Sequence, residues 1–226
     1  MQKRIIPGAE PFRFDAGPTG ALLQHGFSGC PASMRPMGRW LADRGISVVG
    51  PRLPGHGTSW EDLEDTTWQD WEAEAEAALL DLAARCSTVI AAGLSMGGAM
   101  VLHLAAKHPD KVKGVVAVNP DVRRPELALA PIARLFTRTS KGVGNDIKKP
   151  GQDEIVYERV PLKAAAQLGR FYRMVQREIP SVRVPLLVFS SPEDHVATLD
   201  YDADLIFERT LEFAGAVARS TPSAPA

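Results

Sequence analysis

The chain has 226 residues, of which 45% are hydrophobic, and its formal net charge at pH 7 is −1. This length and apolar content suffice for one sizeable core, so we expect a single domain over residues 1–219. The balanced charge and the lack of a basic run give no electrostatic footprint for nucleic acid, and no nucleic-acid partner is expected.

The apolar stretch near the N-terminus is short. Lys3 and Arg4 are followed by only two isoleucines before Pro7, which is too little for a signal-peptide core or a membrane span. Cys30 and Cys86 lack metal-type spacing and are predicted to be free thiols in a reducing compartment. We therefore expect a cytoplasmic protein with no metal, no cofactor and no stable membrane insertion. The small, proline-rich tail over 220–226 is predicted to be disordered.

Predicted strands and helices alternate along the chain. Short apolar runs predict strands over 12–14, 21–25, 46–50, 88–92, 112–118 and 185–190. Helical spacing predicts helices over 36–44, 66–85, the stretch after Ser95, and 202–219. Such alternation is typical of an α/β protein, a mostly parallel sheet with helices on both faces. In the long helix, Glu72, Glu74 and Glu76 are interpreted as a solvated face.

The alternation of strands and helices breaks between residues 120 and 184. Two apolar helical stretches, 127–136 and 162–175, are separated by a polar, glycine-rich link over 141–151. An insertion between two sheet strands is where lids over active sites occur. We expect a small apolar lid, because its Leu and Phe side chains suit acyl chains. The alternative is a pair of packing helices without contact to substrate.

The run from Thr88 to Ala106 carries the chemistry. A β-branched apolar strand enters Gly93-Leu-Ser-Met-Gly97, and an alanine-rich helix follows at once. This strand–turn–helix context predicts a nucleophile elbow with Ser95 as the catalytic serine. The helix N-terminus at the turn favours developing negative charge. The alternative is a chance match in a glycine-rich turn.

Three motifs together resemble the α/β-hydrolase family: His25-Gly-Phe-Ser-Gly-Cys-Pro31, Pro51-Arg-Leu-Pro-Gly-His-Gly57, and Gly93-Leu-Ser-Met-Gly-Gly98. The likeness is closest to its bacterial carboxylesterase and monoacylglycerol-lipase branch and runs from about Leu22 to Phe213. It implies an α/β-hydrolase fold, and an oxyanion hole formed by the backbone N–H groups of Phe27 and Met96. The segment Pro185 to Asp194 resembles the family stretch that ends in the acid of the triad, which implies that role for Asp194.

The base is where the sequence departs from the family pattern. A serine nucleophile needs an imidazole, and of the five histidines His195 remains by elimination. It directly follows Asp194, whereas family members keep a strand and a helix between acid and base. The acid loop and the histidine loop look fused, with the last strand of the sheet lost. The apolar strand over 186–190 would then form a sheet edge that invites a homodimer.

Three outcomes follow from this fusion. The loop bends so that His195 reaches Ser95 while Asp194 orients it, or Asp121 replaces Asp194 as the acid, or the triad is broken. The first hypothesis is therefore a serine ester hydrolase that acts on short- to medium-chain esters or monoacylglycerols through an acyl-enzyme at Ser95. The second is an internally shortened, catalytically impaired hydrolase-fold protein that binds ligands. Acyl transfer to an alcohol and thioester hydrolysis are variants of the first.

Overall fold

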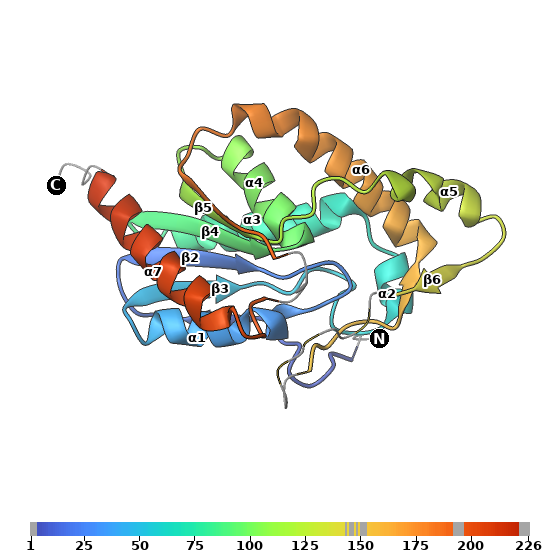
Figure 1. The fold of residues 1–226 in the computed structure, drawn as a ribbon, viewed down its shortest axis with the longest axis horizontal. Coiled ribbons are helices and arrows are strands. Elements are labelled where there is room, and N and C mark those ends of the chain that lie inside the picture. The colour runs from blue at the N-terminus through green and yellow to red at the C-terminus, as the bar shows by residue number, and fades with distance from the viewer. Residues whose placement is uncertain are drawn as a thin grey trace.

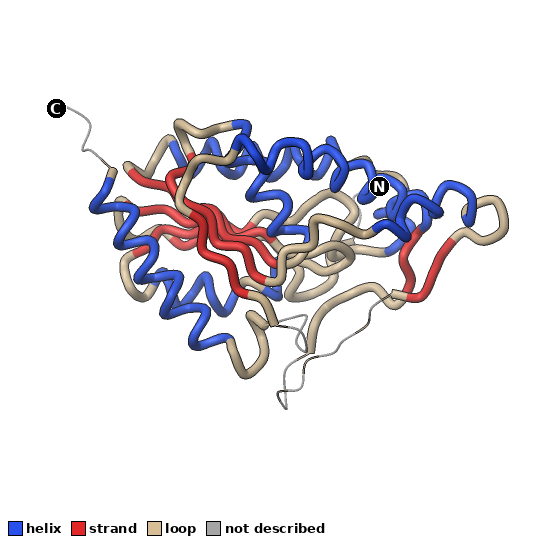
Figure 2. Tube along the Cα trace, turned by 45° about the horizontal axis from the view of Figure 1, so that its top comes forward, coloured by secondary structure: helices blue, strands red, loops and turns tan. Residues whose placement is uncertain are grey.

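The structure is a computed structural model that describes residues 4–142, 144, 147, 149, 153–191 and 197–221. Its centre is a six-stranded sheet (Figure 2). The strand order is β1 (Phe12–Phe14), β3 (Ile46–Gly50), β2 (Thr19–Gln24), β4 (Thr88–Leu94), β5 (Val112–Val118) and β8 (Leu186–Phe189). β1 is antiparallel to β3, and the other neighbours are parallel. The expected mostly parallel sheet is confirmed.

Helices cover both faces of the sheet (Figure 1). On one face lie α1 (Arg35–Ala42) and α7 (Ala203–Ser220), and on the other α3 (Trp68–Ala83), α4 (Met96–Lys107) and α6 (Leu162–Glu178). Each layer has its own apolar core, with Trp71 and Phe171 among the buried residues of the second. The central strand β4 is buried along its whole length, which explains its continuous apolar sequence.

The long helix α3 begins at a capping box. Thr67 accepts a hydrogen bond from the Asp70 backbone N–H, and the Asp70 carboxylate accepts one from the Thr67 backbone N–H. The expected solvated face of this helix is wrong for Glu72, whose side chain is 14% exposed and bonded to His103 and Lys107. Those partners come from α4, so helix periodicity alone could not reveal them.

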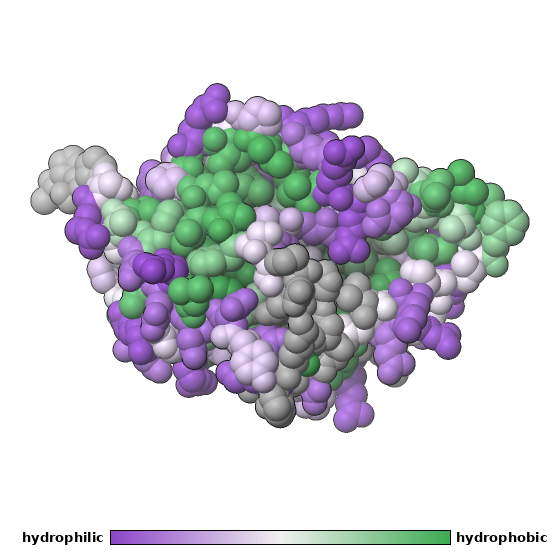
Figure 3. Space-filling view, in the orientation of Figure 1, coloured by the Kyte–Doolittle hydropathy of each residue, from purple (hydrophilic) through white to green (hydrophobic). Residues whose placement is uncertain are grey.

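The strand β8 forms one edge of the sheet, and within the described part of the chain no further strand pairs with it. Leu187 and Phe189 pack toward the layer of α7. Leu186 and Val188 point to the other face and are each 49% exposed. Figure 3 shows apolar side chains gathered between α6 and α7, over this edge. An apolar strand therefore ends the sheet without a cover from the described residues.

The segment between β5 and β8 extends beyond the sheet. It contains a 3-10 helix (Pro125–Leu129), α5 (Ala130–Ala133), and an antiparallel pair of β6 (Thr139–Lys141) with β7 (Arg159–Pro161). The single helix expected over 127–136 is wrong in extent, because regular helix covers only Ala130–Ala133. Pro131 lacks a backbone N–H and lies in the first turn, so it marks the start of this helix after the 3-10 turn. A short helix, α2 (Trp60–Glu64), and two further 3-10 turns, Pro31–Ser33 and Ile179–Ser181, were not expected.

The C-terminal helix is slightly longer than expected. α7 ends at Ser220, which the sequence placed in a disordered tail. Residues 222–226 lie outside the described part of the chain.

Candidate active site

Ser95 sits at the junction of β4 and α4 in a backbone conformation that few non-glycine residues adopt, with φ 54° and ψ −117°. Backbone hydrogen bonds hold the turn: the Ser95 N–H donates to Val118 O at 2.9 Å, and the Gly98 N–H donates to Ser95 O at 2.9 Å. The side chain is half-buried and lines a cavity. This is the strained, partly open geometry of a nucleophile elbow.

The glycines of the elbow are required by close packing. A Cβ at Gly93 would lie 2.1 Å from Gly97 O, and a Cβ at Gly97 would lie 2.2 Å from Gln24 O. The elbow is thus pressed against the end of β2, and any side chain at either position would push the two backbones apart.

The turn after β2 lies directly beside Ser95. A Cβ at Gly26 would stand 3.5 Å from Ser95 Cβ, and Phe27 lines the same cavity as Ser95. Met96 is the first residue of α4. The two residues predicted to donate oxyanion-hole N–H groups are thus both brought next to the serine, and their role stays a prediction.

His25 fixes this turn. The Leu53 N–H donates to His25 Nε2 at 3.2 Å, so Nδ1 carries the proton and donates to Gly26 O at 2.8 Å. Burial lowers the pKa of His25 to about 4, which keeps the ring neutral. His25 therefore serves as a structural donor and acceptor, and both of its ring nitrogens are already engaged.

The other described histidines also have partners away from Ser95. His56 donates to Pro54 O at 3.1 Å and packs edge-on against Phe27, and burial holds its pKa well below the usual value. His103 and His108 bond to carboxylates of the helix layer. The remaining histidine, His195, lies outside the described residues together with Asp194, so their predicted roles as base and acid stay predictions.

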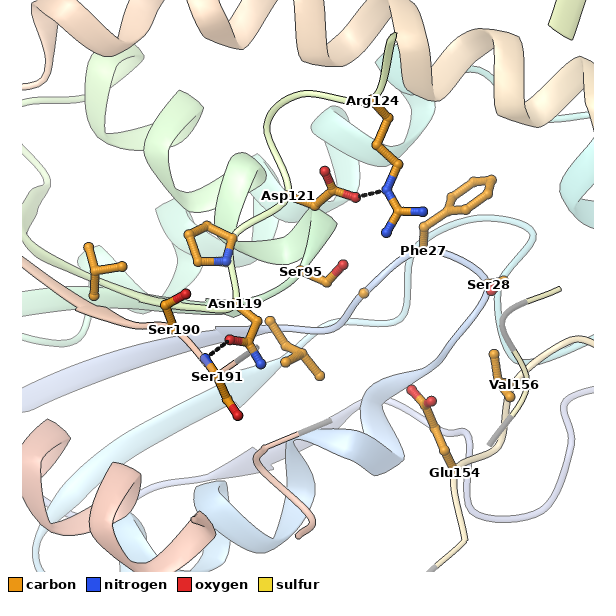
Figure 4. A pocket seen from close by; sticks show the side chains of 15 residues that line it. Phe27, Ser28, Ser95, Asn119, Asp121, Arg124, Glu154, Val156, Ser190 and Ser191 are labelled. Atoms are coloured by element: carbon orange, nitrogen blue, oxygen red, sulfur yellow. Dashed lines mark hydrogen bonds and ion pairs between the residues drawn. The ribbon is translucent and has the colours of Figure 1, made fainter. Parts of the chain in front are cut away.

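Two cavities have Ser95 in their linings. Figure 4 shows the side chains around the first of them. The first, about 480 Å³, has a mixed lining, in which polar groups such as Asn119, Ser190 and Ser191 stand beside apolar side chains such as Leu94 and Val188. The second, about 390 Å³, runs under the inserted segment and is mostly apolar. We call these the polar limb and the apolar limb. The apolar limb is lined by Leu127, Leu129, Ala130, Ala133, Val160, Leu162, Ala165, Leu168 and Tyr172, among others.

Asp121 and Arg124 stand where the two limbs join, and both border each limb. The Arg124 guanidinium donates to the Asp121 carboxylate, and the Asp121 N–H donates to Ser95 O at 3.2 Å. Burial lowers the pKa of Arg124, but the Asp121 charge outweighs it and the pKa is raised. The carboxylate considered as the alternative acid is therefore near Ser95 and already paired with a cation.

Arg124 is a site residue that the sequence analysis missed. Its signal was the spacing Asp121-x-x-Arg124 after an apolar strand, which only the fold turns toward the serine. Tyr172 was missed too; it borders the apolar limb, and burial raises its pKa well above the usual value. Both residues come from the inserted segment rather than from the sheet.

A metal site, a reactive thiol at Cys30 and a membrane-spanning helix each find little support in the described residues. Within them, no group of three His, Cys, Asp or Glu side chains is arranged to hold a metal ion. Burial raises the pKa of the Cys30 thiol to about 11, so the thiolate is disfavoured near neutral pH. Across residues 4–221, as far as they are described, none of the helices is both long and apolar enough to span a bilayer.

Comparison with known proteins agrees with this geometry. The family model described as serine aminopeptidase, S33 (Hydrolase_4), matches residues 21–210. A thermostable monoacylglycerol lipase of Bacillus sp. (strain H-257) is 38% identical over 94% of this chain and 96% of that protein. A carboxylesterase of Bacillus subtilis is 26% identical over 88% of this chain and 80% of that protein.

Solved structures give the same picture. One from work on the metagenome-derived lipolytic enzymes LipS and LipT has a TM-score of 0.88 and 32% identity, covering 94% of this chain and all of that one. A monoacylglycerol lipase of Paleococcus ferrophilus has a TM-score of 0.73 at 15% identity, covering 92% of this chain and 98% of that one, and so shares the fold. The chain belongs to the serine aminopeptidase S33 (Hydrolase_4) family and has the α/β-hydrolase fold.

Proposed function

We propose that the chain is a serine hydrolase that cleaves carboxylic esters of short- to medium-chain acyl groups, monoacylglycerols among them, through an acyl-enzyme at Ser95. One observation carries this proposal: Ser95, in its elbow conformation, stands where an apolar limb and a polar limb meet. An ester has the same division, with an apolar acyl chain on one side of the carbonyl and a polar alcohol on the other. The names of the lipase and esterase relatives agree with this reaction class.

The residues divide the reaction between them. Ser95 Oγ attacks the ester carbonyl carbon while His195 takes its proton, and the backbone N–H groups of Phe27 and Met96 bind the oxyanion. The carbon–oxygen bond to the alcohol then breaks as His195 returns the proton to the leaving oxygen. Water repeats the sequence on the acyl-enzyme and releases the acid. Asp194 or Asp121 orients His195.

The insertion over about 120–184 serves as the lid in this proposal. Its described parts supply most of the apolar wall, and Leu129, Ile132, Leu135 and Phe136 on its outside are more than half exposed. Figure 3 shows this apolar surface over α5. The domain over 1–219 is therefore one catalytic unit with its own acyl-binding cover, and we place it in the cytoplasm.

A homodimer through the sheet edge completes the proposal. The half-exposed Leu186 and Val188 on β8 give a second copy an apolar strand to pair with. Sedimentation should show a concentration-dependent dimer that Val188→Lys disrupts; a monomer at all concentrations would exclude it.

The competing function is a ligand-binding protein with an impaired triad. One observation favours it: the alignment with the Bacillus sp. lipase spans 242 residues, more than the 226 of this chain, so it includes positions that this chain lacks. Hydrolysis of p-nitrophenyl butyrate by the chain and by Ser95→Ala separates the two functions. Ser95-dependent turnover and stoichiometric labelling by a fluorophosphonate support the hydrolase. A folded chain that shows neither is the impaired protein.

A further inference from the structure

A buried histidine joins three helices behind the active site. His103 of α4 has a 5% exposed side chain. Its Nε2 lies 3.0 Å from Glu72 Oε1 of α3, and its Nδ1 lies 2.6 Å from Glu178 Oε2 at the end of α6. The histidine therefore bridges two carboxylates that belong to different helices.

Both contacts together fix the protonation state of the ring. An ionised carboxylate only accepts hydrogen bonds, whereas a neutral imidazole has one N–H and one lone pair. A neutral His103 can therefore satisfy one of the two glutamates, and only the imidazolium donates to both. Burial raises the pKa of Glu72, but hydrogen bonds from Lys107 and His103 outweigh it and the pKa is lowered. Glu72 is thus ionised when the ring is protonated.

The surrounding charges decide which contact depends on the second proton. Lys107 Nζ of α4 lies 2.6 Å from Glu72 Oε1 and 2.9 Å from Glu76 Oε1. Nε2 of His108, the residue that follows α4, lies 2.5 Å from the same oxygen of Glu76. Glu72 therefore keeps a cation when His103 becomes neutral. Glu178, with a 34% exposed side chain, joins this network through His103 and can turn to water.

The helix held in this way forms part of the active site. α6 supplies Leu162, Ala165, Leu168 and Tyr172 to the apolar limb. Phe171, between the last two, packs edge-on against the His103 ring, with centroids 6.1 Å apart. α4, which carries His103, begins directly after Ser95. The ring thus connects the nucleophile helix to the wall of the apolar limb.

We propose that His103 is a positioning residue whose protonated ring holds α6, and with it the wall of the apolar limb, against α4. The hold needs an N–H on both ring nitrogens, because without the second proton Glu178 faces a lone pair. The effect on substrate binding rests on the proposed function, whereas the effect on α6 itself does not.

Hydrogen exchange of the full chain tests the hold on α6 directly. We compare wild type at about pH 5.5 and about pH 8.5, after correction for intrinsic exchange. Exchange near the C-terminal end of α6 should rise about three- to tenfold at the higher pH, as expected for loss of a charge-assisted bond to a partly exposed carboxylate.

Glu178→Gln is the decisive variant. Its amide can accept from the imidazolium or donate to the neutral ring, so the pH dependence of α6 exchange should disappear while the fold, checked by thermal melting, is kept. Glu76→Gln is the matched control, because Glu76 bonds Lys107 and His108 but not α6, and it should keep the wild-type dependence. An unchanged pH dependence in Glu178→Gln, or none in wild type, overturns the proposal.

Kinetics give the second readout. With p-nitrophenyl octanoate, the KM of wild type should rise several-fold from the lower to the higher pH, whereas the KM of Glu178→Gln should not. The kcat values of the two proteins should depend on pH in the same way. With p-nitrophenyl acetate, whose acyl chain hardly enters the apolar limb, the two proteins should have matching KM profiles. A chain without any turnover refutes the proposed function, and hydrogen exchange then still decides the role of His103. A KM that does not separate the two proteins refutes the positioning role.

Discussion

The elbow and the lid are built on opposite principles. At the elbow, small residues let two backbone segments approach so closely that no side chain fits between them. A Cβ at Gly97, for example, would lie only 2.2 Å from Gln24 O. The lid instead leaves large apolar side chains in water, with Phe136 86% exposed. Between residues 122 and 142 it also carries five basic residues against one acidic residue. The comparison teaches that close backbone packing is concentrated around Ser95, whereas the insertion keeps apolar surface available for the proposed ester substrate.

The largest loss of activity is expected when His195, the predicted base, is replaced. His195→Gln should lower kcat for p-nitrophenyl butyrate by about 10³-fold or more, because proton transfer to and from Ser95 is lost. Asp194→Asn and Asp121→Asn, assayed in parallel, identify the acid by the larger loss. Full activity in His195→Gln would contradict the assignment by elimination.

Packing at the elbow should be nearly as intolerant. Gly97→Ala inserts a methyl group against the backbone at the end of β2 and should destabilise the fold by about 2–4 kcal/mol. Urea unfolding measures the change. Gly215→Ala in α7, where the added Cβ would meet the flexible end of Arg219, is the control and should be neutral or stabilising.

The buried His25 should make the fold acid-sensitive. Burial lowers the pKa of His25 in the folded chain to about 4, whereas its pKa in the unfolded chain is near 6.5. Below pH 6.5 the unfolded chain therefore binds more protons, and the free energy of unfolding decreases as the pH is lowered. The expected loss between pH 6.5 and 4 is about 1–3 kcal/mol from this residue. Urea titrations at a series of pH values should show a shallower acid slope in His25→Gln; an identical slope would mean that His25 is not the group responsible.

The smallest effect is expected at the lid surface. Leu135→Ser with Phe136→Ser should leave the rate on a soluble short-chain ester within about twofold, but lower it several-fold on an emulsified monoacylglycerol, where exposed apolar groups contact the lipid. Leu80→Ser, on the exposed side of α3, is the control and should change neither rate. Equal losses on both substrates would indicate damage to the fold instead.

Much of the scaffold could be predicted because its signals are local. The apolar runs that form β1, β3 and β5 gave strands with the observed ends, and the strand–turn–helix around Ser95 gave the elbow. The resemblance in three motifs gave the family and the fold, which the comparisons confirm. Boundaries failed where a long-range contact or a proline decides them, as at Pro131, which marks the start of the short helix α5.

By itself, then, the sequence determined the α/β architecture and the ester-hydrolase class and predicted Ser95 as the nucleophile, because each follows from residues close together in the chain. Only the tertiary structure decided that Arg124 and Tyr172 border the cavity at Ser95, and that His103 bridges Glu72 and Glu178. Those partners are separated by tens of residues, and no periodicity or motif records which side chains meet when helices pack across a sheet. The tertiary fold alone turns them toward one another.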